Sequence, residues 1–130
     1  MRLCSIVVSL VGVVALVFGI IFITQAGSSA QEVADSIQPV TLAELDDKFE
    51  AVKVSQTAMR AAEEPQIQAG TAAPSSTYNY LTIQRAALGL ARTNVGLAGF
   101  VRTAGILDIL VGIGLVLAGV GLFKQSQSIS

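Results

Sequence analysis

The chain is poor in the side chains that usually carry chemistry. It has no histidine, no tryptophan and a single cysteine, Cys4, in 130 residues. Histidine is the usual general base and the commonest metal and haem ligand, so its absence removes the most frequent catalytic and metal-binding arrangements. One thiol cannot close an internal disulfide or build a zinc or iron–sulfur site. We therefore expect no catalytic residue, no metal site and no cofactor, and we predict that the chain is not an enzyme.

Charge is also scarce. Charged residues make up 13% of the sequence, against ~25% in an ordinary soluble domain. The net charge of −1 gives no basic surface for nucleic acid. The sequence has no glycine-rich phosphate loop with a lysine, so we infer no small-molecule substrate. A soluble chain of this length could not bury a sequence that is 52% hydrophobic. The composition favours the lipid bilayer as a partner.

Two nearly uncharged apolar runs, Leu3–Ile23 and Thr103–Phe123, lie near the two ends of the chain. Each has about 21 residues and would form ~32 Å of helix, enough to cross the hydrocarbon core of a bilayer. We predict transmembrane helices at residues 1–25 and 103–124. A secretory signal peptide is the alternative for the first run, but that run is longer than the usual apolar region of a signal peptide. We therefore expect an uncleaved anchor.

Between the spans, residues 26–102 are predicted to form an extramembrane pair of helices. Thr41 and Glu44 have the spacing of a capping box, and Pro65 should stop a helix, which predicts a helix over 42–64 and a loop over 65–77. Apolar residues of that helix share one face and call for a helical partner. They are Leu42, Leu45, Phe49, Val52 and Met59.

The last helix, predicted over 78–102, should continue into the second span as one helix of more than 40 residues, followed by a short tail at 125–130. Its residues alternate steps of three and four, the spacing of one helix face. They are Tyr80, Ile83, Ala87, Leu90, Asn94, Leu97, Val101 and Ala104. Gly89, Gly96 and Gly99 are interpreted as close-packing sites rather than breaks.

The predicted fold class is all-α: a two-pass transmembrane helical hairpin with an extramembrane, antiparallel, coiled-coil-like stalk. The first stalk arm is mainly acidic, while the second carries Arg85, Arg92 and Arg102 and no acid before Asp108. Opposite charges favour folding one arm back on the other, although an exposed ion pair contributes only ~0 to 1 kcal/mol. Solvated charges on independent helices, or complementarity between neighbouring chains, are the alternatives.

Small residues within the spans predict helix–helix interfaces, because lipid tails are as apolar as leucine and association depends on close backbone approach. The candidate interface consists of Ser5, Ser9, Gly12, Ala15 and Gly19 in the first span and Gly105, Gly112 and Gly119 in the second. Gly114, Ala118 and Gly121 lie on another face of the second span and could take a neighbouring protein. The alternative is that glycine is simply common in membrane helices.

Asp108 is the one charged residue within the two apolar runs. An intramembrane carboxylate suggests proton or ion transport, or a polar contact near the membrane edge with Arg102 of a neighbouring chain. Arg85 and Arg92 lie on one helix face and could contact lipid headgroups or an acidic partner. A solvated helix face is the alternative for these two arginines.

The sequence therefore predicts a non-catalytic integral membrane protein that acts in assembly, as an accessory subunit of a larger membrane complex or as a homo-oligomer of copies of itself. The alternatives are an ion- or proton-conducting oligomer that uses Asp108 and a membrane-anchored binding module that presents the 66–79 loop. Arg2 precedes the first span, and the next basic residue is Lys48. This asymmetry favours a cytoplasmic N-terminus, whereas around the second span three arginines lie on the loop side and only Lys124 follows, which favours the opposite orientation. Because the first helix usually dominates, we predict a protein of the plasma (bacterial inner) membrane with both termini cytoplasmic and the loop outside.

Overall fold

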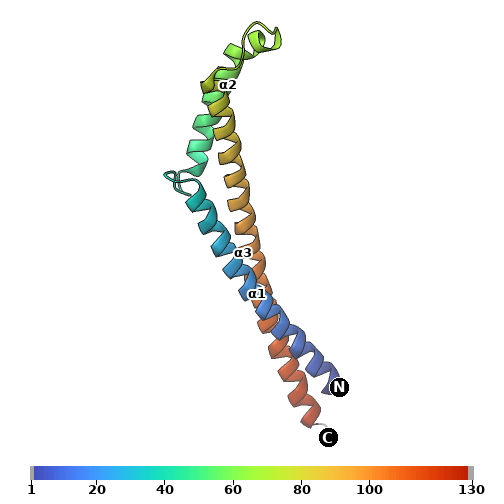
Figure 1. The fold of residues 1–130 in the computed structure, drawn as a ribbon. Helices are drawn as coiled ribbons and strands as arrows, with labels where there is room; N and C mark the ends of the chain where they lie inside the picture. The colour runs from blue at the N-terminus through green and yellow to red at the C-terminus, as the bar shows by residue number, and fades with distance from the viewer. Residues whose placement is uncertain (1, 129–130) are drawn as a thin grey trace. The chain divides into compact units, whose positions relative to one another are not determined.

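The structure is a computed structural model that describes residues 2–128, and all its regular secondary structure in that range is helical. Helix α1 spans Arg2–Ser36, α2 spans Leu45–Gln68 and α3 spans Ser76–Ser128 (Figure 1). Helices α1 and α3 each contain a segment that is long and apolar enough to cross a membrane. The predictions of an all-helical chain and of two such helices are confirmed. Residue 1 of the predicted first span and residues 129–130 of the predicted tail lie outside the described residues.

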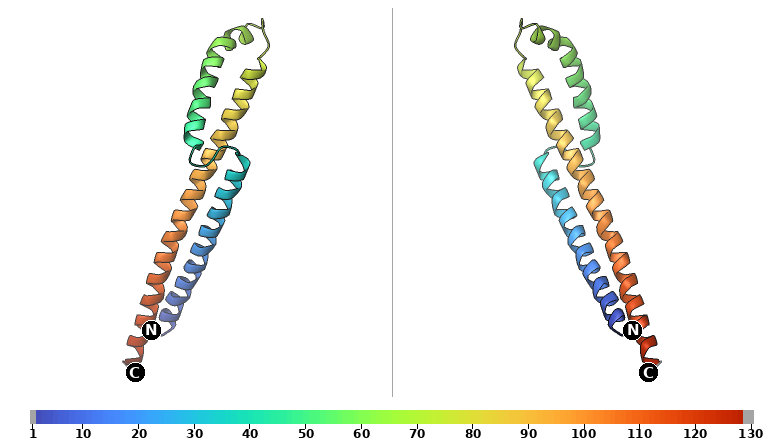
Figure 2. Two further views of the ribbon diagram at one scale, coloured as in Figure 1. Left: turned by 90° about the vertical axis from the view of Figure 1, so that its left-hand side faces the viewer. Right: turned by 90° about the vertical axis from the view of Figure 1, so that its right-hand side faces the viewer.

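The chain divides into two compact units. The first, the span unit, combines Met1–Ser29 with Leu97–Ser130, and the second, the stalk unit, is Ala30–Gly96. In the span unit, α1 lies along the C-terminal part of α3. In the stalk unit, α2 lies along the N-terminal part of α3 (Figure 2). Helix α3 contributes to both units, and at 53 residues it is the single long helix that its unbroken three-and-four spacing predicts.

Helix α2 begins three residues later than the capping-box pattern predicts. Its N-cap is Glu44, and residues 42–44 form a turn. The Glu44 carboxylate accepts hydrogen bonds from the Thr41 hydroxyl (2.8 Å) and the Thr41 backbone N–H (3.2 Å). These bonds lower the pKa of Glu44. The hydroxyl that was expected to cap the helix is thus a donor to Glu44, and only the glutamate half of the capping box forms.

Pro65 does not end α2, which continues to Gln68 and shortens the predicted loop to residues 69–75. Gly70, two residues beyond the end of the helix, has a φ of +69°, which suits glycine. The Gly70 N–H donates to the Ile67 carbonyl and the Thr71 N–H to the Gln66 carbonyl, each at 3.0 Å. This pair of bonds is a Schellman motif, which closes the last turn despite the proline.

Candidate helix-packing site

In the span unit, α1 and α3 meet along small residues spaced seven apart. A strict seven-residue period keeps one narrow stripe of each helix facing its partner. The buried residues of this seam are Ser5, Gly12, Gly19 and Ala26 in α1 and Ala98, Gly105, Gly112 and Gly119 in α3. Six of these eight residues belong to the candidate interface predicted from sequence. Ala15, also predicted, flanks the seam and is half-buried.

The glycines of the seam bring the two backbones into direct contact. A Cβ atom added to Gly12 would lie 2.8 Å from the Gly112 carbonyl oxygen, and one added to Gly19 would lie 2.6 Å from that of Gly105. A Cβ atom added to Gly112 or Gly105 would likewise lie 2.7 Å from the carbonyl oxygen of the facing glycine. Since no side chain fits in these positions, the helices could not approach as closely with any residue but glycine.

A serine hydroxyl extends the seam toward the N-terminal end of α1. Ser5 is 1% exposed and donates a 2.6 Å hydrogen bond to the Gly119 carbonyl oxygen. Ser9 also lies against Gly119: a Cβ atom added to Gly119 would clash with the side chain and backbone of Ser9. In an apolar environment such a hydroxyl needs an acceptor, so this bond both satisfies Ser5 and joins the helices.

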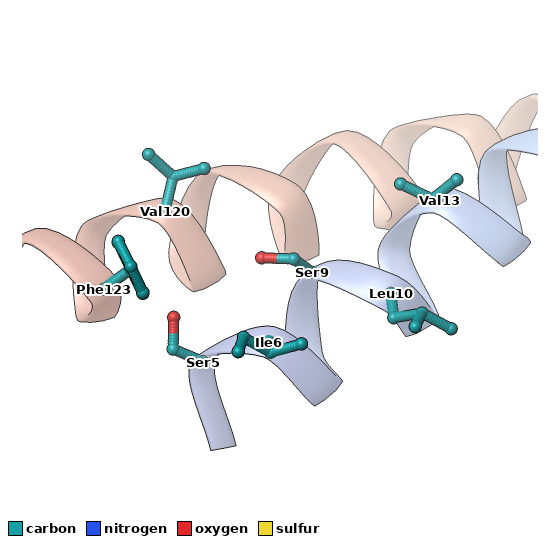
Figure 3. Close-up of a pocket in the computed structure, with 7 residues that line it drawn as sticks. All are labelled: Ser5, Ile6, Ser9, Leu10, Val13, Val120 and Phe123. Atoms are coloured by element: carbon teal, nitrogen blue, oxygen red, sulfur yellow. The ribbon is translucent and has the colours of Figure 1, made fainter. Parts of the chain in front are cut away.

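An open groove lies beside this hydrogen bond (Figure 3). Its volume is about 440 Å³. The residues that line it are Ser5, Ile6, Ser9, Leu10 and Val13 from α1 and Val120 and Phe123 from α3. Apart from the two serines its walls are apolar, and the Ser5 hydroxyl is already bonded to α3. The groove is a surface furrow of the helix pair.

A second set of small residues on α3 has no neighbour in the described chain. A Cβ atom added to Gly114 or Gly121 would meet nothing within 4 Å, and Ala118 is exposed. The same holds for Gly96 and Gly99, so the interpretation of these two as close-packing sites finds no support in contacts among residues 2–128. Of Gly89, Gly96 and Gly99, only Gly89 has a neighbour, the Phe49 ring at 3.3 Å from an added Cβ atom.

In the stalk unit, α2 packs on α3 through a small apolar core. Val33, Leu45, Leu88 and Ala91 are buried, and partly buried Ile37, Phe49, Val52 and Val95 pack against them. Leu45, Phe49 and Val52 belong to the face of α2 that was predicted to need a helical partner. Leu42, at the predicted start of that face, precedes the helix and is exposed.

Arg85 and Arg92 are both engaged within the stalk unit. Arg92 Nε lies 2.7 Å from Asp46 Oδ1, and its guanidinium lies 5.3 Å from the centre of the Phe49 ring. The Arg85 guanidinium donates a 2.7 Å hydrogen bond to Oε1 of Gln56, which is 5% exposed. Gln56 was not singled out from the sequence, because a lone glutamine carries no signal of burial.

A polar clasp, formed by Glu63 of α2 and Ser75 before α3, closes the loop between these helices. The Glu63 carboxylate accepts bonds from the Ser75 hydroxyl (2.6 Å) and backbone N–H (3.0 Å), which lower the pKa of Glu63. The Ser75 hydroxyl in turn accepts the Tyr78 backbone N–H at 3.0 Å and caps α3. A serine just before a helix is a readable cap signal, but its glutamate partner is twelve residues away and was missed.

Asp108 and Arg102 are not brought together. Asp108 is half-buried beside the seam and Arg102 is exposed. Within the part of the chain that the structure describes, neither side chain makes an ion pair or a hydrogen bond. The Asp108 carboxylate therefore has no polar partner among residues 2–128 of its own chain.

Comparisons with protein-family models, curated proteins and solved structures gave no match to this chain. Among residues 2–128, no three or more aspartate, glutamate or cysteine side chains gather as they would around a metal ion. Among the described residues, the span unit contains a packed helix seam and the stalk unit contains a charged helical pair.

Proposed function

We propose that the protein is a two-pass integral membrane protein that acts in assembly. In this proposal α1 and the C-terminal part of α3 cross the bilayer as an antiparallel hairpin. The residues of the stalk unit stand outside the membrane as a helical stalk. The chain serves as a structural subunit of a larger membrane complex or of an oligomer of itself.

The exposure of the apolar segments carries the membrane proposal. Only 11% of the most apolar window of each long helix is buried within the chain. Leu10 in α1 and Leu117 in α3 are 60% and 67% exposed. The core helix of a soluble protein would bury such side chains, because exposing them to water costs about 1.5–3 kcal/mol each. Acyl chains remove that cost.

The way in which the spans pack supports a role in assembly. In lipid, helices gain nothing by packing leucine side chains together, because lipid tails are equally apolar. Close backbone contact then becomes the main source of association. The seam uses this contact within the chain. The open face formed by Gly114, Ala118 and Gly121 offers the same kind of contact to a neighbouring span. We place the termini on the cytoplasmic side of the plasma membrane and the stalk outside, because the basic residue Arg2 precedes the first span.

Purification in a mild detergent, followed by mass spectrometry of the intact particles, tests this function. We expect the chain in particles with other membrane subunits or with copies of itself. Changing both Gly114→Ile and Gly121→Ile should shift it toward the free chain, since the added side chains hold a neighbouring helix away. The control Ile113→Phe adds bulk to an exposed position of the same helix and should leave the particles intact. A wild-type chain that is monomeric in every mild detergent would contradict the assembly role.

A further inference from the structure

The stalk part of α3 exposes a row of apolar side chains on a face other than the one that packs on α2. Tyr80, Ile83 and Leu90 are 62%, 69% and 64% exposed, whereas Leu88 and Ala91 are buried in the α2–α3 core. Ala87 and Asn94 complete the exposed row, which we call the outer face. The helix therefore has two apolar faces, of which only one has a partner among residues 2–128.

The spacing of the outer face is that of a two-stranded coiled coil. Its positions follow steps of three and four, so Tyr80, Ala87 and Asn94 take the heptad position a and Ile83 and Leu90 take position d. Single exposed apolar residues are ordinary on a protein surface, but a continuous row with this period is the pattern of a helix–helix seam. A helical partner is the occupant that this pattern fits.

Asn94 indicates which helix that partner is. An asparagine at position a, packed against an apolar residue, would leave its amide donor and acceptor without partners, which is unfavourable. A second asparagine directly opposite satisfies both groups, which is how a lone asparagine at position a fixes register in parallel dimers. A second copy of the chain, lying parallel and in register, places its own Asn94 directly opposite the first.

The charges of α3 are arranged so that two copies can approach. Between Ser76 and Gly96 the only charged residues are Arg85 and Arg92, and two bare helices of this kind would repel each other. Arg92 is compensated by Asp46, with Glu50 at 3.8 Å, and Arg85 is bonded to Gln56. Both arginines take the heptad position f, on the side away from the a and d positions, and the outer face carries no charge.

We propose that two copies of this chain pair in parallel through the outer face of α3, residues 80–94. The pairing rests on the proposed membrane function in one respect. Two heptads make a short seam that is weak between free helices. Anchoring both chains in one membrane with the same orientation raises their effective concentration and imposes the parallel direction. The particular partner in assembly is thus a second copy, held by the stalk.

Disulfide crosslinking in native membranes tests the pairing. In a Cys4→Ser background, Leu90→Cys places a thiol at a d position of the outer face. Thr82→Cys places one on an exposed position of α3 off that face. A disulfide needs Cα atoms within ~7 Å, which symmetric d positions meet and position 82 does not. We expect Leu90→Cys to give a covalent dimer of twice the chain mass, at about tenfold the yield of Thr82→Cys, if the seam forms.

A charge variant tests the pairing at a second position of the outer face. Asn94→Asp places two carboxylates opposite each other and should lower the Leu90→Cys dimer yield about tenfold, because like charges at facing positions repel. Thr82→Asp adds the same charge off the outer face and should leave the yield unchanged. Equal yields from Leu90→Cys and Thr82→Cys, or a crosslink to a protein of another mass, would overturn the pairing. Since only chains in the membrane fraction are scored, such a result would leave the membrane location standing, whereas a chain absent from that fraction would refute the proposed function.

Discussion

At the scale of single residues, the position of a glycine on the helix decides whether it matters. Gly112 and Gly114 are two residues apart in α3, yet only Gly112 faces the backbone of α1. Small residues within the two spans indicated six of the eight seam positions from sequence. The open surroundings of Gly96 and Gly99 were not predictable, because a glycine looks the same in the sequence whether it faces a neighbour or empty space.

Alanine at these two positions should therefore have opposite consequences. Gly112→Ala adds a Cβ atom 2.7 Å from the Gly12 carbonyl oxygen and should destabilise the helix pair by ~1–3 kcal/mol, as overpacking usually does. Gly114→Ala meets nothing within 4 Å and should leave it unchanged or slightly more stable. Thermal unfolding in detergent micelles checks this, with the loss of protection of a thiol at buried Ala26 (Ala26→Cys, Cys4→Ser) as the signal. Equal melting temperatures for the two variants would refute the seam.

At the scale of helices, the number of elements was easier to predict than their ends. The apolar periodicity of α2 and α3 indicated both helices, but Pro65 and Thr41 misplaced the limits of α2 by three or four residues. A proline in the last turn of a helix loses little when the turn is closed by other bonds, as the Schellman motif at Gly70 does here. The Glu63–Ser75 clasp could not be predicted, because the loop geometry brings its partners together.

The clasp should be visible in the titration of Glu63. The two hydrogen bonds from Ser75 lower the pKa of Glu63. They therefore stabilise the loop at pH values above the ordinary glutamate pKa, and this stabilisation is lost as the pH falls through the lowered pKa. Ser75→Ala removes the hydroxyl donor and should raise the pKa of Glu63 toward its ordinary value. The pKa of Glu64, lowered by Arg60, should not change. Carboxyl NMR titration measures both pKa values. A Glu63 pKa that is the same in the wild type and in Ser75→Ala would show that the clasp does not form in solution.

At the scale of the whole molecule, composition and the two long apolar runs were sufficient to predict an all-helical chain with two helices able to cross a membrane. Which stalk side chains pair could not be read from the sequence. Arg85 and Arg92 were candidates for lipid or partner contacts, and the structure instead gives them Gln56 and Asp46 of the same chain. Charge counts show that partners of opposite sign exist, but the choice among them depends on the register between α2 and α3.

The central claim is that both apolar segments lie in the bilayer, and cysteine accessibility in intact membranes tests it most directly. Val14, Ile113 and Val54 are 44%, 46% and 68% exposed in the chain itself, so protein packing alone would leave all three reactive. In a Cys4→Ser background, we expect Val14→Cys and Ile113→Cys to react with a water-soluble maleimide at least about tenfold more slowly than Val54→Cys, because a thiol in lipid does not ionise. All three should react alike after denaturation in SDS. Equal rates for the three thiols before denaturation would contradict the account.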